Sequence, residues 1–135
     1  MAAEDKWGLA DPRMQGFMAT YERAWSAPSA ERLRALWTED AEYHMAGAPE
    51  PVVGGDAIAG SVEGFLQVCP DLALRPTAAG AGKDTLFIQF HAGATVKGRH
   101  VGWVAVDRFD FPPEGIRANR GEAFFTPSVL DGAFD

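Results

Sequence analysis

The residue with the clearest chemical signature is Asp107, an acid within an apolar strand pattern. Side chains alternate along a strand, so one face of residues 101–111 consists of Trp103, Ala105, Asp107, Phe109 and Phe111. A carboxylate on such a face is costly to remove from water. We therefore expect Asp107 either to have a strong partner or to stay protonated at neutral pH through a raised pKa. The alternative is a structural hydrogen bond near a strand end, without chemistry.

Tyr21 is the second candidate, and it lies on an apolar helical stripe. Spacings of three and four residues place five side chains on one face of the first helix: Met14, Phe17, Met18, Tyr21 and Trp25. A tyrosine on such a stripe is more often a core residue whose hydroxyl bonds the backbone. We therefore expect Tyr21 to be buried in the core.

Three helices are predicted to hold these side chains. Asp11-Pro12 is typical of a helix start, and the break at residues 27–29 ends that helix. Asp56 is expected to cap a third helix, which Pro70 stops. The inner faces of the second and third helices are predicted to be Leu33, Leu36 and Trp37, and Ile58, Val62, Phe65, Leu66 and Cys69, respectively.

The remaining segments predict strands. A brief strand is expected at 41–45 and longer ones at 72–77, 85–92, 101–111 and 116–125. The turns between the last four are short and rich in glycine and proline, which forces neighbouring strands to pair antiparallel. A sheet with one apolar face must bury that face. The sequence therefore predicts the α+β class, with a curved sheet wrapped around helices.

Composition limits the function classes. A chain of 135 residues with 47% hydrophobic residues suits one domain with a real core. A net charge of −7 with scattered basic residues disfavours nucleic-acid binding. The single cysteine and three dispersed histidines predict no disulfide, no metal and no cofactor. No apolar stretch approaches membrane-spanning length, so we expect a cytoplasmic protein without a membrane partner.

The order of these residues resembles ketosteroid isomerase, a member of the nuclear transport factor 2-like (NTF2-like) superfamily. The segment Trp37-Thr38-Glu39-Asp40-Ala41 looks like the family's aromatic-x-acid-acid-Ala segment, and counting back from it places the oxyanion-hole tyrosine on Tyr21. The segment Val106-Asp107-Arg108-Phe109-Asp110-Phe111 is similar to the family's Ile-Asp-His-Phe-Arg-Phe strand and places the second donor on Asp107.

This resemblance spans most of the chain and has structural implications. It implies a cone-shaped NTF2-like fold, with three N-terminal helices packed in a curved, mainly antiparallel sheet. It also implies an apolar small-molecule ligand, such as a steroid- or polyketide-like ketone, and a homodimer formed through the outer sheet face.

The resemblance fails at the general base, because the family's catalytic aspartate aligns with Met45, which cannot accept a proton. Glu122 is one replacement, since SnoaL-like cyclases resemble this chain in placing an acidic base on a late strand. His44 is another if a bulge turns it inward, and Asp40 is a third. The structural alternatives are a salt bridge of Glu122 with Arg120, an outward-facing His44, and a capping role for Asp40.

Two classes of function therefore stay open. One is an enzyme: an isomerase with a replaced base, or a SnoaL-like cyclase using Glu122. The other is a non-catalytic binding protein that has kept the cavity. The predicted catalytic residues are Tyr21, Asp107, Glu122 and His44, and the predicted substrate-binding residues are Phe17, Trp25, Met45, Phe65, Phe90, Trp103, Phe109 and Phe125. We expect one domain at 11–128, between an N-terminal extension at 1–10 and a tail at 129–135.

Overall fold

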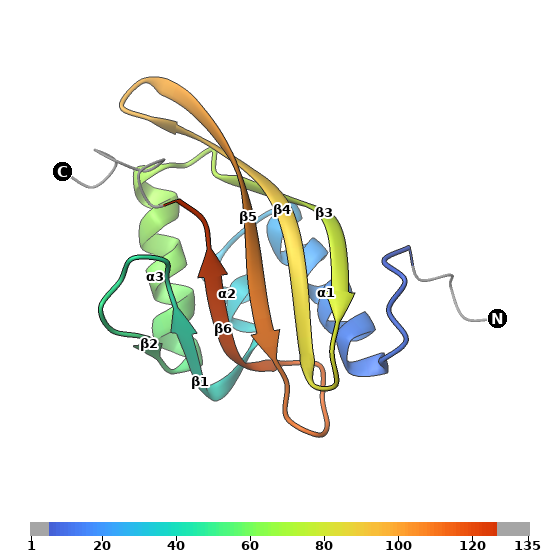
Figure 1. Cartoon of the computed structure of the whole chain (residues 1–135). Coiled ribbons are helices and arrows are strands. Elements are labelled where there is room, and N and C mark those ends of the chain that lie inside the picture. The colour runs from blue at the N-terminus through green and yellow to red at the C-terminus, as the bar shows by residue number, and fades with distance from the viewer. Residues whose placement is uncertain (1–5, 127–135) are drawn as a thin grey trace.

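A computed structural model describes residues 6–126 as three helices and one six-stranded sheet (Figure 1). The elements in chain order are α1 (Pro12–Ser26), α2 (Ala30–Arg34), β1 (Trp37–His44), β2 (Val52–Val53), α3 (Gly55–Val68), β3 (Ala73–Ala81), β4 (Thr85–Val96), β5 (Arg99–Asp110) and β6 (Ala118–Phe124). The tail predicted at 129–135, and residues 1–5 of the predicted N-terminal extension, lie outside the described residues.

The first helix starts where the sequence predicts. The Asp11 side chain accepts a hydrogen bond from the Arg13 backbone N–H at 2.9 Å, and Pro12 is the first helical residue. Along the predicted stripe Met14, Phe17 and Tyr21 are buried. This helix therefore anchors its apolar face in the core, with Tyr21 in the middle of that face.

Several predicted boundaries are wrong: besides the two described next, the strand predicted at 41–45 already begins at Trp37, and the strand predicted at 72–77 continues to Ala81. Leu36 and Trp37 do not continue the second helix, because α2 ends at Arg34 and Trp37 begins β1. Both side chains are buried, and a buried turn followed by a strand produces the same short apolar spacing as a helix. Asp56 does not cap α3, since the N-cap is Gly54. Asp56 instead accepts a hydrogen bond from the Arg34 side chain at 2.7 Å.

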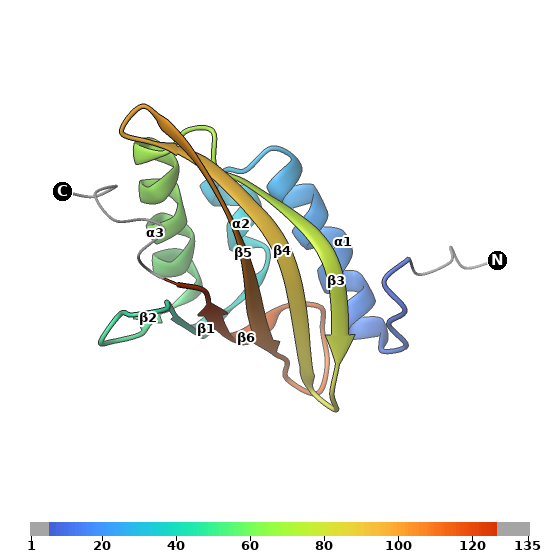
Figure 2. The same ribbon diagram turned by 45° about the horizontal axis from the view of Figure 1, so that its top comes forward.

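The strands follow the order β2-β1-β6-β5-β4-β3. The antiparallel pairing of β3, β4, β5 and β6 confirms the prediction from the short turns. The sequence predicted neither the two-residue β2 nor the parallel pairing of β1 with β6. Figures 1 and 2 show a strongly curved sheet with the helices gathered on one of its faces. The α+β prediction of helices packed in a curved, mainly antiparallel sheet is confirmed.

The two faces of the sheet differ as alternation predicts. On β4, Leu86, Ile88 and Phe90 are buried toward the helices, whereas Phe87, Gln89 and His91 are exposed on the outer face. The last strand departs from its predicted pattern, because it begins at Ala118 and its alternation is irregular: Ala118 is fully buried, while Arg120 and Glu122 are only half-buried. Its inward-facing residues near the site are instead Gly121 and Ala123.

Candidate functional site

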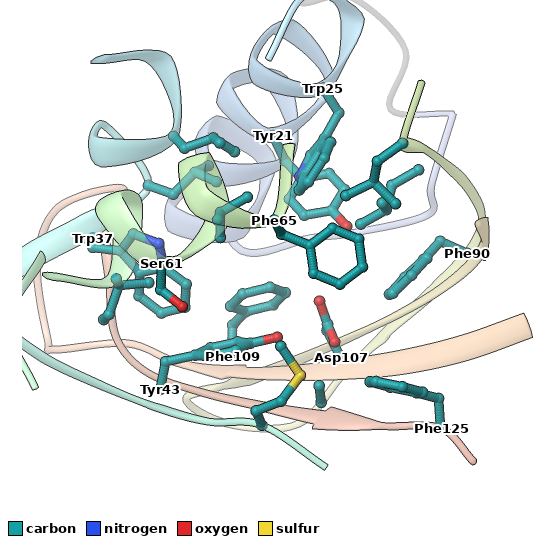
Figure 3. A pocket seen from close by; sticks show the side chains of 18 of the residues that line it. Tyr21, Trp25, Trp37, Tyr43, Ser61, Phe65, Phe90, Asp107, Phe109 and Phe125 are labelled. Carbon is teal, nitrogen blue, oxygen red and sulfur yellow. The ribbon is translucent and has the colours of Figure 1, made fainter. Parts of the chain in front are cut away.

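A pocket opens between the helices and the inner face of the sheet (Figure 3). Water-sized spheres fill about 120 Å³ of it. Seven of the predicted substrate-binding residues line it, namely Trp25, Met45, Phe65, Phe90, Trp103, Phe109 and Phe125. The pocket is therefore walled mainly by aromatic and aliphatic side chains from both the helices and the strands.

Asp107 enters this pocket from the middle of β5. Its neighbours on the adjacent strands are Ile88 and Ala123, both buried and apolar. The Asp107 side chain is 6% exposed, and its Oδ1 atom has no hydrogen-bond partner among the described residues. Burial alone raises the pKa of Asp107 to about 8. Of the two outcomes expected from the sequence, these surroundings favour the second, an acid that stays protonated at neutral pH.

Tyr21 reaches the same space from α1. It is 1% exposed, and its hydroxyl has no hydrogen-bond partner among the described residues. Its ring lies 6.0 Å from the Phe109 ring, centroid to centroid, in an edge-on arrangement. Burial, followed by the charge of Asp107, raises the pKa of Tyr21 well above its usual value. Figure 3 shows the Tyr21 hydroxyl and the Asp107 carboxyl pointing into one space.

Sequence reasoning missed Tyr43, a third oxygen-bearing side chain in the pocket. Tyr43 lies on β1 and lines the pocket. Burial and then the charge of Asp107 raise its pKa well above the usual value. Figure 3 shows its hydroxyl directed toward the carboxyl from the side opposite Tyr21. The available signal was alternation, since Tyr43 shares a strand face with Met45 in the predicted site.

Gly121 makes room for that arrangement. A Cβ atom at Gly121 would lie 2.9 Å from Cδ2 of Tyr43 and 2.9 Å from Cζ3 of Trp37, which is closer than real Cβ contacts. The Trp37 and Tyr43 rings pack against each other edge-on, with centroids 5.6 Å apart. The lack of a side chain at 121 therefore lets both rings lie close to β6 beside the pocket.

His44 and Glu122 are brought together, but they do not line this pocket. They are direct neighbours across the parallel pairing of β1 and β6. Both line a second hollow, which shares Met45, Ala123 and Phe125 with the pocket. These three shared residues thus border both hollows, which lie side by side.

Of the structural alternatives, the pairing of Glu122 with Arg120 is present, whereas Asp40 lies within β1 and does not cap a helix, and His44 Nε2 is buried without a hydrogen-bond partner among the described residues. His44 Nε2 lies 3.5 Å from Glu42 Oε2, and Glu122 Oε1 lies 3.5 Å from Arg120 Nη2. Asp40 is exposed and accepts a hydrogen bond from the Thr38 hydroxyl at 3.1 Å. None of the three predicted bases is among the residues that line the pocket.

Phe17 also lies outside the pocket, contrary to its predicted contact with substrate. It is fully buried, with its ring 4.7 Å from that of Phe109 and 5.1 Å from that of Phe111. The residue sits one helical turn before Tyr21 and faces the interior beneath the pocket wall. A helical stripe predicts which side chains face the core, but it does not show which of them line a pocket and which pack inside the core.

The pocket therefore offers hydrogen bonds but no ionised base. Its titratable lining groups are Tyr21, Tyr43 and Asp107, and all three are neutral at pH values below about 8 by the pKa directions above. Neutral hydroxyl and carboxyl groups can donate to a carbonyl, enolate or phenolate oxygen. Within residues 6–126, no three His, Cys, Asp or Glu side chains are grouped to hold a metal ion. No helix in that range is long and apolar enough to span a bilayer.

Comparison with known proteins identifies a family whose profile matches this chain and solved structures that share its fold. The profile of the SnoaL-like domain family matches residues 18–118. A comparison with curated proteins finds no significant match.

Several solved structures share the fold at low sequence identity. A putative SnoaL-like polyketide cyclase from Jannaschia sp. CCS1 is 12% identical with a TM-score of 0.74, over 93% of this chain and 96% of that one. A steroid delta-isomerase from Pseudomonas aeruginosa is 19% identical with a TM-score of 0.70, over 92% and 88%. A protein with a ketosteroid isomerase-like fold from Catenulispora acidiphila, in complex with trimethylamine, is 16% identical with a TM-score of 0.75, over 87% and 92%.

Proposed function

The chain belongs to the SnoaL-like domain family, and we propose that its pocket binds an apolar ring compound through a ketone, enol or phenol oxygen. The observation that carries this proposal is the unpaired state of two buried polar groups facing one apolar space, the Asp107 carboxyl and the Tyr21 hydroxyl. Buried polar groups without partners are rare and costly, and a ligand oxygen would satisfy both.

The charge state of the site favours an oxygen that is, or becomes, negative. A protonated Asp107 and the hydroxyls of Tyr21 and Tyr43 provide donors from three different elements, with no buried cation beside them. Donors fixed in a dry cavity stabilise an oxyanion more strongly than water does. Binding should therefore shift a ketone ligand toward its enolate form and a phenol toward its phenolate.

Binding is favoured over the isomerase and cyclase reactions because of the missing base. Moving a proton between two carbons needs a group that accepts it within about 3 Å of the ligand, or through one water. Met45 lines the pocket at the aligned position, whereas Glu122 and His44 line the second hollow and not the pocket. A catalytic role for either would need the ligand or a water to reach from the pocket into the second hollow.

One observation supports a second candidate, a keto–enol tautomerase in which Asp107 itself carries the proton. Its pKa of about 8 is close to neutral, where an acid–base group works best. Exchange of the α-protons of a bound cyclic ketone with deuterated solvent, followed by NMR, separates the candidates. Asp107-dependent exchange supports the tautomerase, and binding without exchange supports a non-catalytic protein.

The binding proposal is tested by calorimetry with 2-naphthol at pH 7. We expect Asp107→Ala and Tyr21→Phe each to weaken binding by about tenfold or more, since a hydrogen bond to a charged or strongly polar oxygen contributes about 1.5–3 kcal/mol. Glu122→Gln, in the second hollow, is the matched control and should leave the affinity unchanged. Unaltered affinity in both pocket variants would remove the proposal.

The pH dependence has a defined sign. In the proposed complex the protonated Asp107 donates a hydrogen bond to the ligand oxygen, so the complex weakens as Asp107 loses its proton. Affinity in the parent should therefore fall as pH rises above about 8.

We further propose a homodimer through the outer sheet face. Phe87, Val104 and Phe124 are exposed on the adjacent strands β4, β5 and β6. Exposed large apolar side chains that cluster on one face are typical of protein interfaces. Sedimentation velocity should show a dimer that Val104→Asp or Phe124→Asp dissociates. A monomeric parent would contradict this.

A further inference from the structure

The pocket is small for the ligands that the resemblance to ketosteroid isomerase implies. Its volume is about 120 Å³. A cavity of about 150 Å³ in another protein holds one benzene molecule, whereas pockets for drug-sized ligands measure about 300–1,000 Å³. The pocket therefore fits about one ring, and a second ring must extend toward its mouth.

The side chains at the inner end of the pocket are too tightly packed to move and enlarge it. Phe109 packs against Phe17, Tyr21 and Trp37 with ring centroids 4.7, 6.0 and 5.6 Å apart. Behind the same end of the pocket, Leu33 and Ile58 are fully buried. Interiors packed in this way resist the insertion of further atoms, since extra carbon groups force side chains and backbone to move. A larger ligand cannot gain space at this end.

The side toward α3 is less tightly packed. Phe65 and Val62 on α3 are half-buried, and Ser61 is exposed, although all three line the pocket. Figure 3 shows the Phe65 ring next to the Asp107 carboxyl, with Phe90 and Phe125 both to the right of the carboxyl in this view. The Phe65 ring thus limits how far a rigid, flat ligand can extend while its oxygen stays beside Asp107.

The polar groups are also unevenly placed. Tyr21, Tyr43 and Asp107 converge on one region, and the remaining lining side chains are apolar except for Ser61 and the indole N–H groups of the tryptophans. A ligand that suits this distribution has one oxygen at its inner end and hydrocarbon elsewhere. Any second polar group must point out of the mouth.

We infer that the ligand is a one- or two-ring phenol, enol or cyclic ketone, and not a four-ring steroid. The inference rests on the proposed function, because it takes the ligand oxygen to lie between Tyr21 and Asp107. The volume of the pocket then limits the substrate to the smaller members of the apolar ring compounds whose oxygen could bind beside Tyr21 and Asp107.

The test is a series of phenols titrated into the parent protein and Asp107→Ala by calorimetry at pH 7: phenol, 2-naphthol and the four-ring phenolic steroid estradiol. We expect 2-naphthol to bind about tenfold tighter than phenol, because its second ring buries more apolar surface. Estradiol should bind no tighter than phenol. Asp107-dependent binding of estradiol that matches or exceeds that of 2-naphthol would overturn the inference while leaving the proposed function intact.

Failure of the proposed function has a different signature. If Asp107→Ala changes the affinity of none of the three phenols, the oxygen site is absent and the inference falls with it. A reciprocal variant, Phe65→Ala, sharpens the size claim by opening the mouth. It should raise estradiol affinity by about tenfold and weaken 2-naphthol several-fold. An estradiol affinity that stays the same in a folded Phe65→Ala protein would contradict the role given to that ring.

Discussion

Two acids three residues apart on β5 meet opposite surroundings. Asp107 faces inward between Ile88 and Ala123 and has no described hydrogen bond. Asp110 faces outward, where its Oδ1 accepts from the Thr85 hydroxyl at 2.7 Å and from Arg108 Nε at 3.1 Å. Arg120 Nη1 lies 3.8 Å from its other oxygen. The outer face of the sheet therefore provides polar partners to a carboxyl, and the inner face does not.

The difference shows that the fold leaves the Asp107 carboxyl without a hydrogen-bond partner among the described residues, so that a ligand can provide one. An outer-face carboxyl with three polar neighbours is complete as it stands. The inner-face carboxyl is neutral because burial disfavours its charge, and it shares its apolar surroundings with two tyrosine hydroxyls. Substitutions that remove or change this difference between the surroundings of Asp107 and Asp110 test it.

Asp107→Asn should have the largest effect, through the pH dependence of stability. The folded pKa of about 8 lies well above the unfolded value of about 3.9, so the folded parent binds more protons between these pH values. The Asp107 contribution is then fully present below pH 4 and is lost as pH rises to 8. Four pKa units correspond to roughly 5 kcal/mol of unfolding free energy. Urea unfolding at pH 5, 7 and 9 should show this decline in the parent and not in Asp107→Asn. Parallel curves would contradict it.

Gly121→Ala should disturb the inner face by crowding. The added methyl group meets the Trp37 and Tyr43 rings at distances that require them to move. Such overpacking costs about 1–3 kcal/mol. Gly102→Ala on β5 is the control, since its nearest contact would be an ordinary 3.7 Å to the Ala92 carbonyl oxygen. Thermal unfolding should separate the two variants, and equal melting temperatures would show that the rings do not need the space.

Ala123→Ser should weaken the contrast by giving the inner acid a partner. Position 123 pairs directly with Asp107 across β5 and β6, and directly opposed residues interact. A hydroxyl there can donate to the ionised carboxyl, which lowers the Asp107 pKa by about one unit for a hydrogen bond of about 1 kcal/mol. An NMR titration of the variant measures this shift. No change relative to the parent would mean that the two side chains do not meet.

Asp110→Asn should have the smallest effect and the opposite sign at high pH. It removes exposed ion pairs with Arg108 and Arg120, each worth about 0–1 kcal/mol. At pH 9 this variant should be slightly less stable than the parent, whereas Asp107→Asn should be more stable. If Asp107→Asn and Asp110→Asn are both more stable than the parent at pH 9, the surroundings of an ionised carboxyl are equally unfavourable on the two faces, which contradicts the account.

Local patterns were enough to predict the inner acid and its helical partner. Alternation on β5 placed Asp107 inward, and the helical stripe placed Tyr21 in the core. Both rules depend only on the repeat of a single element. The same logic placed His44 outside the pocket that Tyr43 and Met45 line, although His44 and Met45 both line the second hollow.

What could not be predicted depends on contacts between distant segments. The parallel pairing of β1 with β6 sets His44 beside Glu122, and a register shift between Trp37 and Glu42 accompanies it. No local pattern encodes that pairing. Phe17 and Tyr21 lie on one stripe, yet only Tyr21 lines the pocket, because the rings packed around them decide which of the two is covered.

The charge state of Asp107 is the claim that the rest depends on. Carbon-13 NMR of the side-chain carboxyls, with the Asp107 signal assigned by its loss in Asp107→Asn, follows that group directly as pH is changed. We expect its resonance to titrate with an apparent pKa of about 8. A midpoint near the usual value of about 3.9 would show an ionised acid at neutral pH and would contradict the account.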